Sequence, residues 1–187
     1  TLAINNVLQS QVIDVLAPKY VRSGNTGKVG QLIEDMNSGA VSALFIYNAN
    51  PVYNLPNGAE FAEAVAKVGL SVSFSMSCDQ TAAVCKYVAT VPHYLESWGD
   101  VEIKKGHYSL IQPTIHPLFN TRQFQDSLLK WMGSDQSYYD YLRSEWQTNV
   151  LGGGSWNKTL HDGALKVALT EEETVVGEVD LDAANAA

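Results

Sequence analysis

The chain has 187 residues, of which 45% are hydrophobic and 17% are charged, and its formal net charge is −8. This length suits a domain with a substantial buried core, and the aromatic content of 10% argues against intrinsic disorder. An acidic chain repels a phosphate backbone, which disfavours nucleic-acid binding. The apolar runs 41–47 and 70–74 are much shorter than the roughly 18 residues that a membrane helix needs.

The chain contains two cysteines, Cys78 and Cys85. Two are too few for a disulfide framework or for the four thiolates of an iron–sulfur cluster. The sequence starts at Thr1 without a segment that resembles a signal peptide. We therefore expect a processed or excised piece of a longer protein.

The first half of the chain has the periodicity of helices that alternate with strands. The run Val41 to Tyr47 is apolar apart from Ser42, which predicts a strand buried on both faces. The order strand, helix, strand, helix, strand is typical of a parallel sheet with right-handed crossovers. In chain order, the expected helices and strands cover residues 1–16, 28–37, 41–47, 57–69, 70–76, 79–85 and 87–91.

The second half is less regular, because Pro113 and Pro117 interrupt it. We expect a long loop over residues 93–107, a short strand over 108–111, and helices over 122–131, 137–146 and 156–161. The tail from Glu171 is acidic and then rich in alanine, which predicts poor order. The expected organisation is one α/β domain over residues 1–165, followed by a tail over 166–187.

Polar side chains follow each of the three expected parallel strands. In an open parallel sheet, ligands bind outside the carboxyl ends of the strands, so these connections form one candidate rim. The residues on the three connections are Asn48, Asn50 and Tyr53, then Ser77, Cys78 and Asp79, then His93, Glu96, Trp98 and Asp100.

Each of these residues also has a structural explanation. Asn48 and Asn50 suit Asx-turns before a proline, and Asp79 suits a helix N-cap, where its carboxylate disfavours a phosphate. Cys78 lacks a cationic neighbour that would activate its thiol as a nucleophile. His93 and Glu96 have the spacing of helical metal ligands, but Pro92 argues against a helix there. The residues alone therefore predict an α/β binding or docking domain without a visible catalytic centre and without a metal site.

Several strings resemble molybdopterin oxidoreductases of the dimethyl-sulfoxide-reductase superfamily. The strand and loop over residues 44–51, LFIYNANP, are similar to the start of a cofactor-binding segment in that superfamily. The stretch HYLESWGD over 93–100 and the elements over 112–122 resemble its polysulfide-reductase-like members. The strings over 104–110 and 156–163 are most similar to the large iron–sulfur/molybdopterin-like subunit of bacterial alternative complex III.

This resemblance implies a three-layer α/β fold, with a mostly parallel twisted sheet, helices on both faces and a helical C-terminal part. It implies a domain of a subunit in a respiratory quinol:electron-acceptor oxidoreductase complex, a scaffold without catalysis in isolation. Two alternatives are a domain that binds pterin–guanine dinucleotide in an active molybdenum oxidoreductase, and a stand-alone α/β module for a small molecule or a protein. Gene context separates the module from the other two.

The resemblance also places the site. Asn48, Asn50, Ser77, Asp79 and Glu96 fall where active relatives line a nucleotide or pterin pocket. No cofactor is expected in this chain, whereas molybdopterin guanine dinucleotide and iron–sulfur clusters are implied for the parent. The implied partners are the remaining domains of the parent subunit and the other subunits of a membrane-associated complex. That complex faces the periplasmic side of the bacterial cytoplasmic membrane, and the isolated chain is expected to be soluble.

Overall fold

The computed structural model of the chain describes Leu8, Lys19 and residues 24–168. The described residues divide into two compact units. The sheet unit comprises Gly24–Gly99 and Ile111–Glu145, and the hairpin unit contains Asp100–Leu110 and the chain from Trp146 onward. The helix expected over 1–16 and the tail expected from Glu171 lie outside the described residues, and the assignment of 1–165 as one domain stays a prediction.

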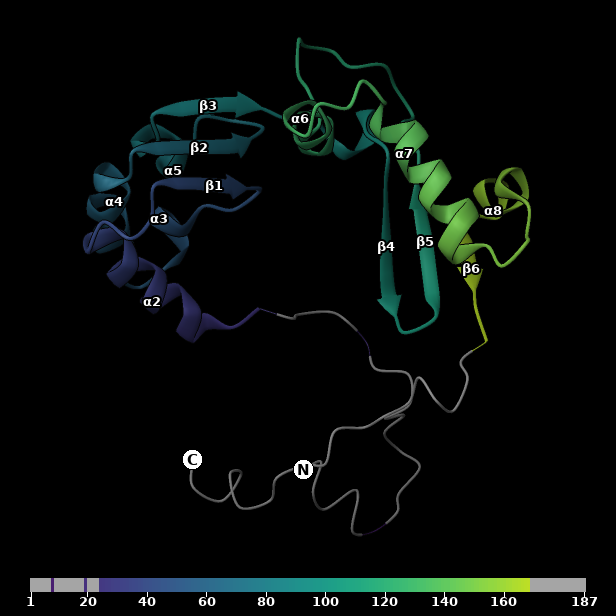
Figure 1. Cartoon of the computed structure of the whole chain (residues 1–187), viewed down its shortest axis with the longest axis horizontal. Helices are drawn as coiled ribbons and strands as arrows, with labels where there is room; N and C mark the ends of the chain where they lie inside the picture. Colours follow the sequence, from purple (N-terminus) through teal and green to yellow (C-terminus); the bar gives the residue numbers. More distant parts are fainter. Residues whose placement is uncertain (1–7, 9–18, 20–23, 169–187) are drawn as a thin grey trace. The chain divides into compact units, whose positions relative to one another are not determined.

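A parallel three-stranded sheet forms the centre of the sheet unit (Figure 1). Its strands are β1 (Ala43–Tyr47), β2 (Leu70–Ser75) and β3 (Tyr87–Thr90), in the order β1-β2-β3. Val72 on β2 is the register partner of Phe45 on β1 and of Tyr87 on β3, and both pairings are parallel. The predicted parallel sheet is therefore confirmed, and the three strands end at the same edge.

The helices of the sheet unit follow the alternation of elements that the sequence predicts. Asn25 caps α2 by accepting a hydrogen bond from the Gly27 N–H at 3.0 Å, and Asp79 caps α5 by accepting one from the Ala82 N–H at 2.8 Å. The Asn57 side chain does not cap α4, since its amide donates to the Glu60 carboxylate at 3.3 Å. These helices are α2 (Thr26–Asn37), α3 (Pro51–Asn54), α4 (Gly58–Lys67), α5 (Gln80–Val84), α6 (Phe124–Trp131) and α7 (Tyr138–Glu145).

Helices α2 and α4 cover one face of the sheet. Leu44 and Ile46 of β1 pack there in one hydrophobic cluster with Met36 of α2 and with Phe61 and Val65 of α4. The second face packs on α6, where the Phe74 ring lies 4.7 Å from the Phe124 ring in an edge-on geometry. Because alternate side chains of a strand point to opposite faces, the sheet has a helical layer on each side.

The prediction that β1 is buried on both faces is wrong. Its side chains alternate between exposed and buried, and the rings of Phe45 and Tyr47 are 43% and 45% exposed. The side chains of β1 are more exposed than predicted because β1 lies at the edge of the sheet, whereas β2 is the central strand. An apolar run shows which residues a strand contains, whereas the burial of their side chains depends on how many neighbouring elements pack against the strand.

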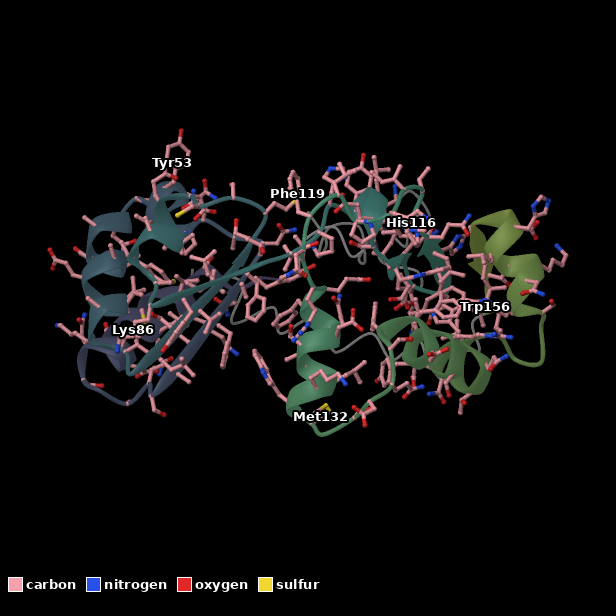
Figure 2. All side chains as sticks on the ribbon, turned by 90° about the horizontal axis from the view of Figure 1, so that it is seen from above. Tyr53, Lys86, His116, Phe119, Met132 and Trp156 are labelled. Carbon is pink, nitrogen blue, oxygen red and sulfur yellow. The ribbon has the colours of Figure 1, made fainter. Side chains whose placement is uncertain are left out.

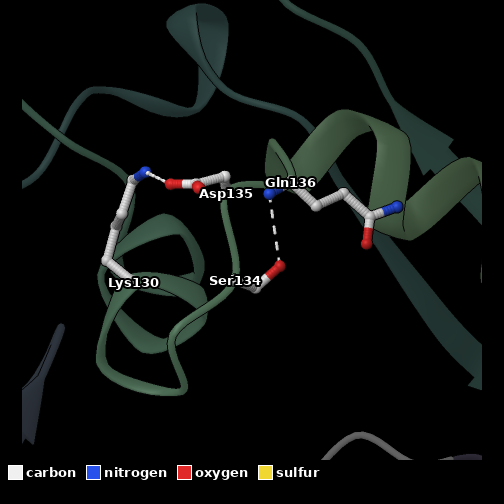
Figure 3. Close-up of polar contacts among 4 residues, drawn as sticks. All are labelled: Lys130, Ser134, Asp135 and Gln136. Atoms are coloured by element: carbon white, nitrogen blue, oxygen red, sulfur yellow. Dashed lines mark hydrogen bonds and ion pairs between the residues drawn. The ribbon is translucent and has the colours of Figure 1, made fainter.

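The link between α6 and α7 is held by short-range contacts. Gly133 adopts a left-handed φ of 78°, and the next N–H, that of Ser134, donates to the Leu129 carbonyl at 2.9 Å. Figure 3 shows the two contacts that follow: Lys130 pairs with Asp135 at 2.7 Å, and the Gln136 N–H donates to Ser134 Oγ at 3.2 Å. These contacts stabilise the turn between α6 and α7.

The hairpin unit contains most of an antiparallel sheet with the order β4-β5-β6. The strands are β4 (Gly99–Lys104), β5 (His107–Ile111) and β6 (Ala164–Lys166). The prediction of a long loop over 93–107 is wrong, because η1 (Tyr94–Glu96) and β4 form there. The sequence GDVEIK alternates polar and apolar residues, and Gly106 at a φ of 74° allows the turn that pairs β4 with β5.

Trp146 is the centre of the hairpin unit. Its ring is fully buried and lies 6.0 Å from the rings of both Tyr108 and Trp156, and its Nε1 donates to Asp100 at 2.8 Å. Trp156, labelled in Figure 2, begins α8 (Trp156–Asp162), and Trp146 begins the π-helix η2 (Trp146–Val150). Among the described residues, no helix has both the length and the apolarity that crossing a membrane requires.

Candidate functional site

The connection after β1 is built around two asparagines. Asn48 has a left-handed φ of 53°, and its N–H extends the sheet by donating to the Phe74 carbonyl at 2.9 Å. The Asn50 side-chain oxygen Oδ1 accepts from the Thr81 N–H at 3.2 Å and from the Thr81 hydroxyl at 2.8 Å. The Asn50 amide also donates to Gln80 at 2.7 Å. Asn50 therefore ties the β1 connection to the start of α5.

The connection after β2 is a short turn that leads into α5. Ser77 and Cys78 are exposed on it. One oxygen of the Asp79 carboxylate accepts from the Ala82 N–H at 2.8 Å, and the other accepts from the Ser75 hydroxyl at 3.3 Å. The prediction that Asp79 is an N-cap is confirmed, and both of its oxygens serve the local fold.

Glu96 stabilises the connection after β3 through two hydrogen bonds. One of its oxygens accepts from the His93 N–H and the other from the Leu118 N–H, each at 3.1 Å. His93 Nδ1 accepts in return from the Leu95 N–H at 3.3 Å, which completes a capping box. The spacing of His93 and Glu96 thus serves a helical cap. Among the residues that the structure describes, no group of three or more His, Cys, Asp or Glu could hold a metal ion.

The structure brings some of the nominated residues together and separates others. Asn50 links the first connection to the second through Thr81 and Gln80, two residues that the sequence reasoning missed. Thr81 is fully buried although it follows a predicted cap by only two positions, and no sequence pattern singles it out. Asp100 belongs to the hairpin unit, where its carboxylate accepts a hydrogen bond from Trp146 Nε1.

The two cysteines differ in their surroundings. Cys78 is exposed, whereas Cys85 is half-buried against the cluster beneath α4. Burial raises the pKa of the Cys85 thiol, and the nearby charge of Asp79 adds to this, while a hydrogen bond with Ser71 acts in the opposite direction. A raised pKa leaves little thiolate at neutral pH, so Cys85 is not an activated nucleophile.

Comparison with known proteins finds a curated relative and related solved structures. No family model matches the chain. It is 40% identical over 94 residues to the menaquinone reductase, molybdopterin-binding-like subunit of Nitratidesulfovibrio vulgaris, a match that covers 48% of this chain and 14% of that protein. Acetylene hydratase from Pelobacter acetylenicus superposes with a TM-score of 0.56 at 15% identity, which covers 74% of this chain and 20% of that one.

These similarities show the fold of the chain and its likeness to part of a molybdopterin-binding-like subunit. The superposition on acetylene hydratase shows that this chain shares the α/β fold of the matched part of that protein. The resemblance to molybdopterin oxidoreductases that the sequence motifs indicate is confirmed, and this chain resembles part of a molybdopterin oxidoreductase-like subunit. It spans 14% of the length of the curated relative and 20% of acetylene hydratase.

Proposed function

We propose that this domain is a scaffold within the molybdopterin-oxidoreductase-like subunit of a respiratory quinol:electron-acceptor oxidoreductase complex. The relative from N. vulgaris is named as a subunit of a menaquinone reductase, and menaquinone is a quinone. The motifs shared with alternative complex III support the same class of complex. In this proposal the domain itself carries out no chemistry.

The scaffold proposal is supported mainly by the hydrogen bonds that polar side chains on the rim form within the fold. Three of the five nominated residues, Asn50, Asp79 and Glu96, direct their side-chain atoms to neighbouring loops and helix starts. A carboxylate with both oxygens bonded to its own fold contributes to stability, and a ligand must compete with those bonds. Only Asn48 and Ser77 of the five are exposed.

The same residues do not fit a complete pterin–guanine dinucleotide. Such a cofactor carries a pyrophosphate, which is bound by cationic side chains or by a helix N-terminus that presents free N–H groups. Residues 48–50 and 77–79 contain no lysine or arginine, and the Asp79 carboxylate occupies the start of α5. Asp79 could accept hydrogen bonds from a guanine amine, but these residues alone do not provide a seat for the pyrophosphate.

The parent protein extends beyond this domain in the proposal. Molybdopterin guanine dinucleotide and iron–sulfur clusters, where the parent has them, are held by other parts of it. The partners are those other domains and the remaining subunits of a membrane-associated complex on the periplasmic side of the bacterial cytoplasmic membrane. The length of the relatives supports this, because this chain matches only 14% of one and 20% of the other.

A second candidate is the domain of an active enzyme that binds the guanine end of the cofactor. The observation in its favour is the backbone of Asn48, where a non-glycine residue adopts a left-handed φ of 53°. Such conformations cluster at ligand-binding sites, although asparagine tolerates them better than most residues.

Titration with GDP distinguishes the two candidates in this chain. The scaffold proposal predicts no saturable heat of binding up to millimolar GDP in calorimetry. Saturable binding to the wild-type chain that is lost in Asp79→Asn would contradict it, provided that the variant keeps its unfolding midpoint. Asparagine retains the capping oxygen, so this variant removes the charge and keeps the N-cap.

Metal analysis of the longer parent subunit supplies the second test. The scaffold proposal predicts molybdenum far below one atom per chain in the purified subunit. Molybdenum near one per chain, together with pterin fluorescence after acid extraction, favours the enzyme and eliminates the scaffold.

A further inference from the structure

The outer side of β1 presents backbone groups that its own sheet does not use. The Ser42 carbonyl accepts from the Leu70 N–H at 3.0 Å, and the Asn48 N–H donates to the Phe74 carbonyl at 2.9 Å. In a strand, alternate residues direct their N–H and C=O groups to the same side. Residues 44 and 46 therefore bond to β2, and the backbone groups of Ala43, Phe45 and Tyr47 point away from it.

This side of β1 is open among the residues that the structure describes. β1 is the terminal strand of its sheet, and β2 is the one strand that pairs with it there. Natural edge strands are usually protected by lysine, proline, a bulge or a covering element. The strand reads ALFIY, without a charged residue or a proline, and its five residues pair with β2 in unbroken register.

The side chains beside this edge form an aromatic surface. The Phe45 ring lies 5.3 Å from the Trp131 ring, and the Tyr47 ring stacks on Phe124 at 4.7 Å. Phe45, Tyr47 and Trp131 are still 43%, 45% and 57% exposed, respectively. A parallel sheet normally has both faces covered, so an edge strand with half-exposed aromatic rings indicates a missing neighbour.

We propose that β1 accepts a further β-strand, supplied by the part of the longer subunit that lies outside this chain. The added strand bonds to the outward groups of Ala43, Phe45 and Tyr47, and its apolar side chains cover the rings of Phe45 and Tyr47. This inference rests on the proposed function, in which the chain is one domain of a longer polypeptide. The relatives carry several times the length of this chain, so polypeptide is available for that strand.

The chemistry of the edge favours a strand of the same subunit over a second copy of this chain. Each copy has a net charge of −8, and two copies repel each other at low ionic strength. An intramolecular strand pays little entropy for association, because the effective concentration of a linked segment is high. A neutral apolar edge with three outward N–H and C=O pairs needs a partner that provides backbone groups.

Amide hydrogen exchange at single-residue resolution tests the proposal. In this chain alone, the amides of Phe45 and Tyr47 exchange rapidly, whereas those of Leu44 and Ile46 are protected by β2. In the longer subunit purified from the same gene, the amides of Phe45 and Tyr47 become at least 100-fold slower. Rates for Phe45 and Tyr47 that are equal in the two proteins overturn the proposal.

Two proline variants supply a matched pair. Ala43→Pro removes an outward N–H and places a ring at the open edge, while the bonds from β1 to β2 remain. It leaves the circular dichroism and the unfolding midpoint of this chain unchanged, and it abolishes the added protection of Phe45 and Tyr47 in the longer subunit. Leu44→Pro removes a bond to β2 and destabilises both proteins. Protection in the longer subunit that survives Ala43→Pro contradicts the proposal.

Two further results have distinct meanings. A gene that encodes no polypeptide beyond this chain refutes the proposed function itself, and the inference with it. A chain that dimerises in sedimentation analysis with protected Phe45 and Tyr47 amides shows that a second copy covers the edge. That result overturns the inferred occupant but leaves the proposed function untouched.

Discussion

At the scale of single residues, two phenylalanines on one face of the sheet provide a comparison of burial. Phe74 on the central strand is 1% exposed, and Phe45 on the edge strand is 43% exposed. We expect Phe74→Ala to lower the free energy of unfolding by about 3–5 kcal/mol, the cost of emptying a buried aromatic site. Phe45→Ala should cost about 1–2 kcal/mol, because part of its ring is already in water.

Urea denaturation of the two variants measures this difference. The sequence alone predicts about 3–5 kcal/mol for Phe45→Ala, on the assumption of a buried ring in a central strand. The structure lowers that expectation because β1 is at the edge. Equal losses in the two variants would mean that the edge of β1 is covered in this chain.

The thiol of Cys85 gives a prediction that depends on pH. Burial raises its pKa in the folded chain, so the unfolded chain loses this proton first as the pH rises. The contribution of this thiol to stability is therefore complete below the ordinary pKa of cysteine and declines above it. We expect iodoacetamide to modify Cys85 far more slowly than the exposed Cys78 at neutral pH, with a gain for Cys85 only in alkaline solution.

Peptide mass spectrometry of the labelled chain measures both rates in one sample. The same reaction in urea gives the unfolded reference, in which the difference between Cys85 and Cys78 should disappear. Rapid labelling of Cys85 in the folded chain at neutral pH would contradict its position beneath α4.

At the scale of elements, the packing of α3 on α4 depends on one glycine. A Cβ atom added at Gly58 would lie 2.0 Å from the Val52 carbonyl oxygen, which belongs to the backbone and cannot rotate away. We expect Gly58→Ala to destabilise the fold by about 2–3 kcal/mol or more, because the two helices must separate. Gly30 on the exposed side of α2 has no atom within 4 Å of such a Cβ.

Gly30→Ala is the matched control for this prediction. The same substitution there should raise stability by about 0.4–1 kcal/mol, because alanine reduces the freedom of the unfolded chain. Thermal and urea unfolding of the two variants should therefore move in opposite directions. A neutral effect of Gly58→Ala would place α3 and α4 further apart than the structure has them.

Elements whose boundaries depend on local patterns were predictable. The N-cap at Asp79 and the helix end at Asn37 follow from short-range hydrogen bonding, which the sequence displays directly, whereas the start of α2 at Thr26 precedes the expected residue 28. The strand over 99–104 was missed because it lies between the irregular stretch after Pro92 and a glycine turn, and its pairing depends on other strands. Pairing between strands is a tertiary property, and composition alone underestimates it.

In the candidate site as well, local sequence predicted some features, whereas others depend on contacts between residues far apart in the chain. Polar residues after each strand identified the rim, because parallel strands end at one edge. The part played by Asn50 could not be predicted, since its partners Gln80 and Thr81 are 30 and 31 residues away in sequence. Likewise, nothing local shows that Glu96 accepts a hydrogen bond from the N–H of Leu118.

At the scale of the whole molecule, net charge governs solubility. The chain carries 20 acidic and 12 basic residues, and its isoelectric point calculated from the sequence is about 4.8. We expect minimal solubility close to that pH, where carboxylate protonation cancels the net charge and the molecules cease to repel one another. Turbidity measured between pH 4 and pH 8 at low salt checks this expectation.

Two exposed carboxylates have a pKa that a neighbouring lysine lowers. Hydrogen bonding and charge from Lys130 lower the pKa of Asp135, and Lys158 lowers that of Asp162 in the same way. Both carboxylates stay ionised to a lower pH, and the stabilisation from each pair is lost as the pH falls through the pKa of the folded state.

A solubility minimum above pH 6 in the turbidity measurement would contradict the acidic charge balance.

The sequence by itself determined the alternation of strands and helices, the parallel direction of the sheet and the acidic character of the molecule. These follow from periodicity, capping and charge, which are properties of neighbouring residues or of simple sums. Tertiary structure alone decided that β1 lies at the edge, that Asn50 joins two connections, and that Trp146 centres a separate unit with Asp100. Those features depend on contacts between residues far apart in the chain, whose free energies become apparent only when the chain is folded.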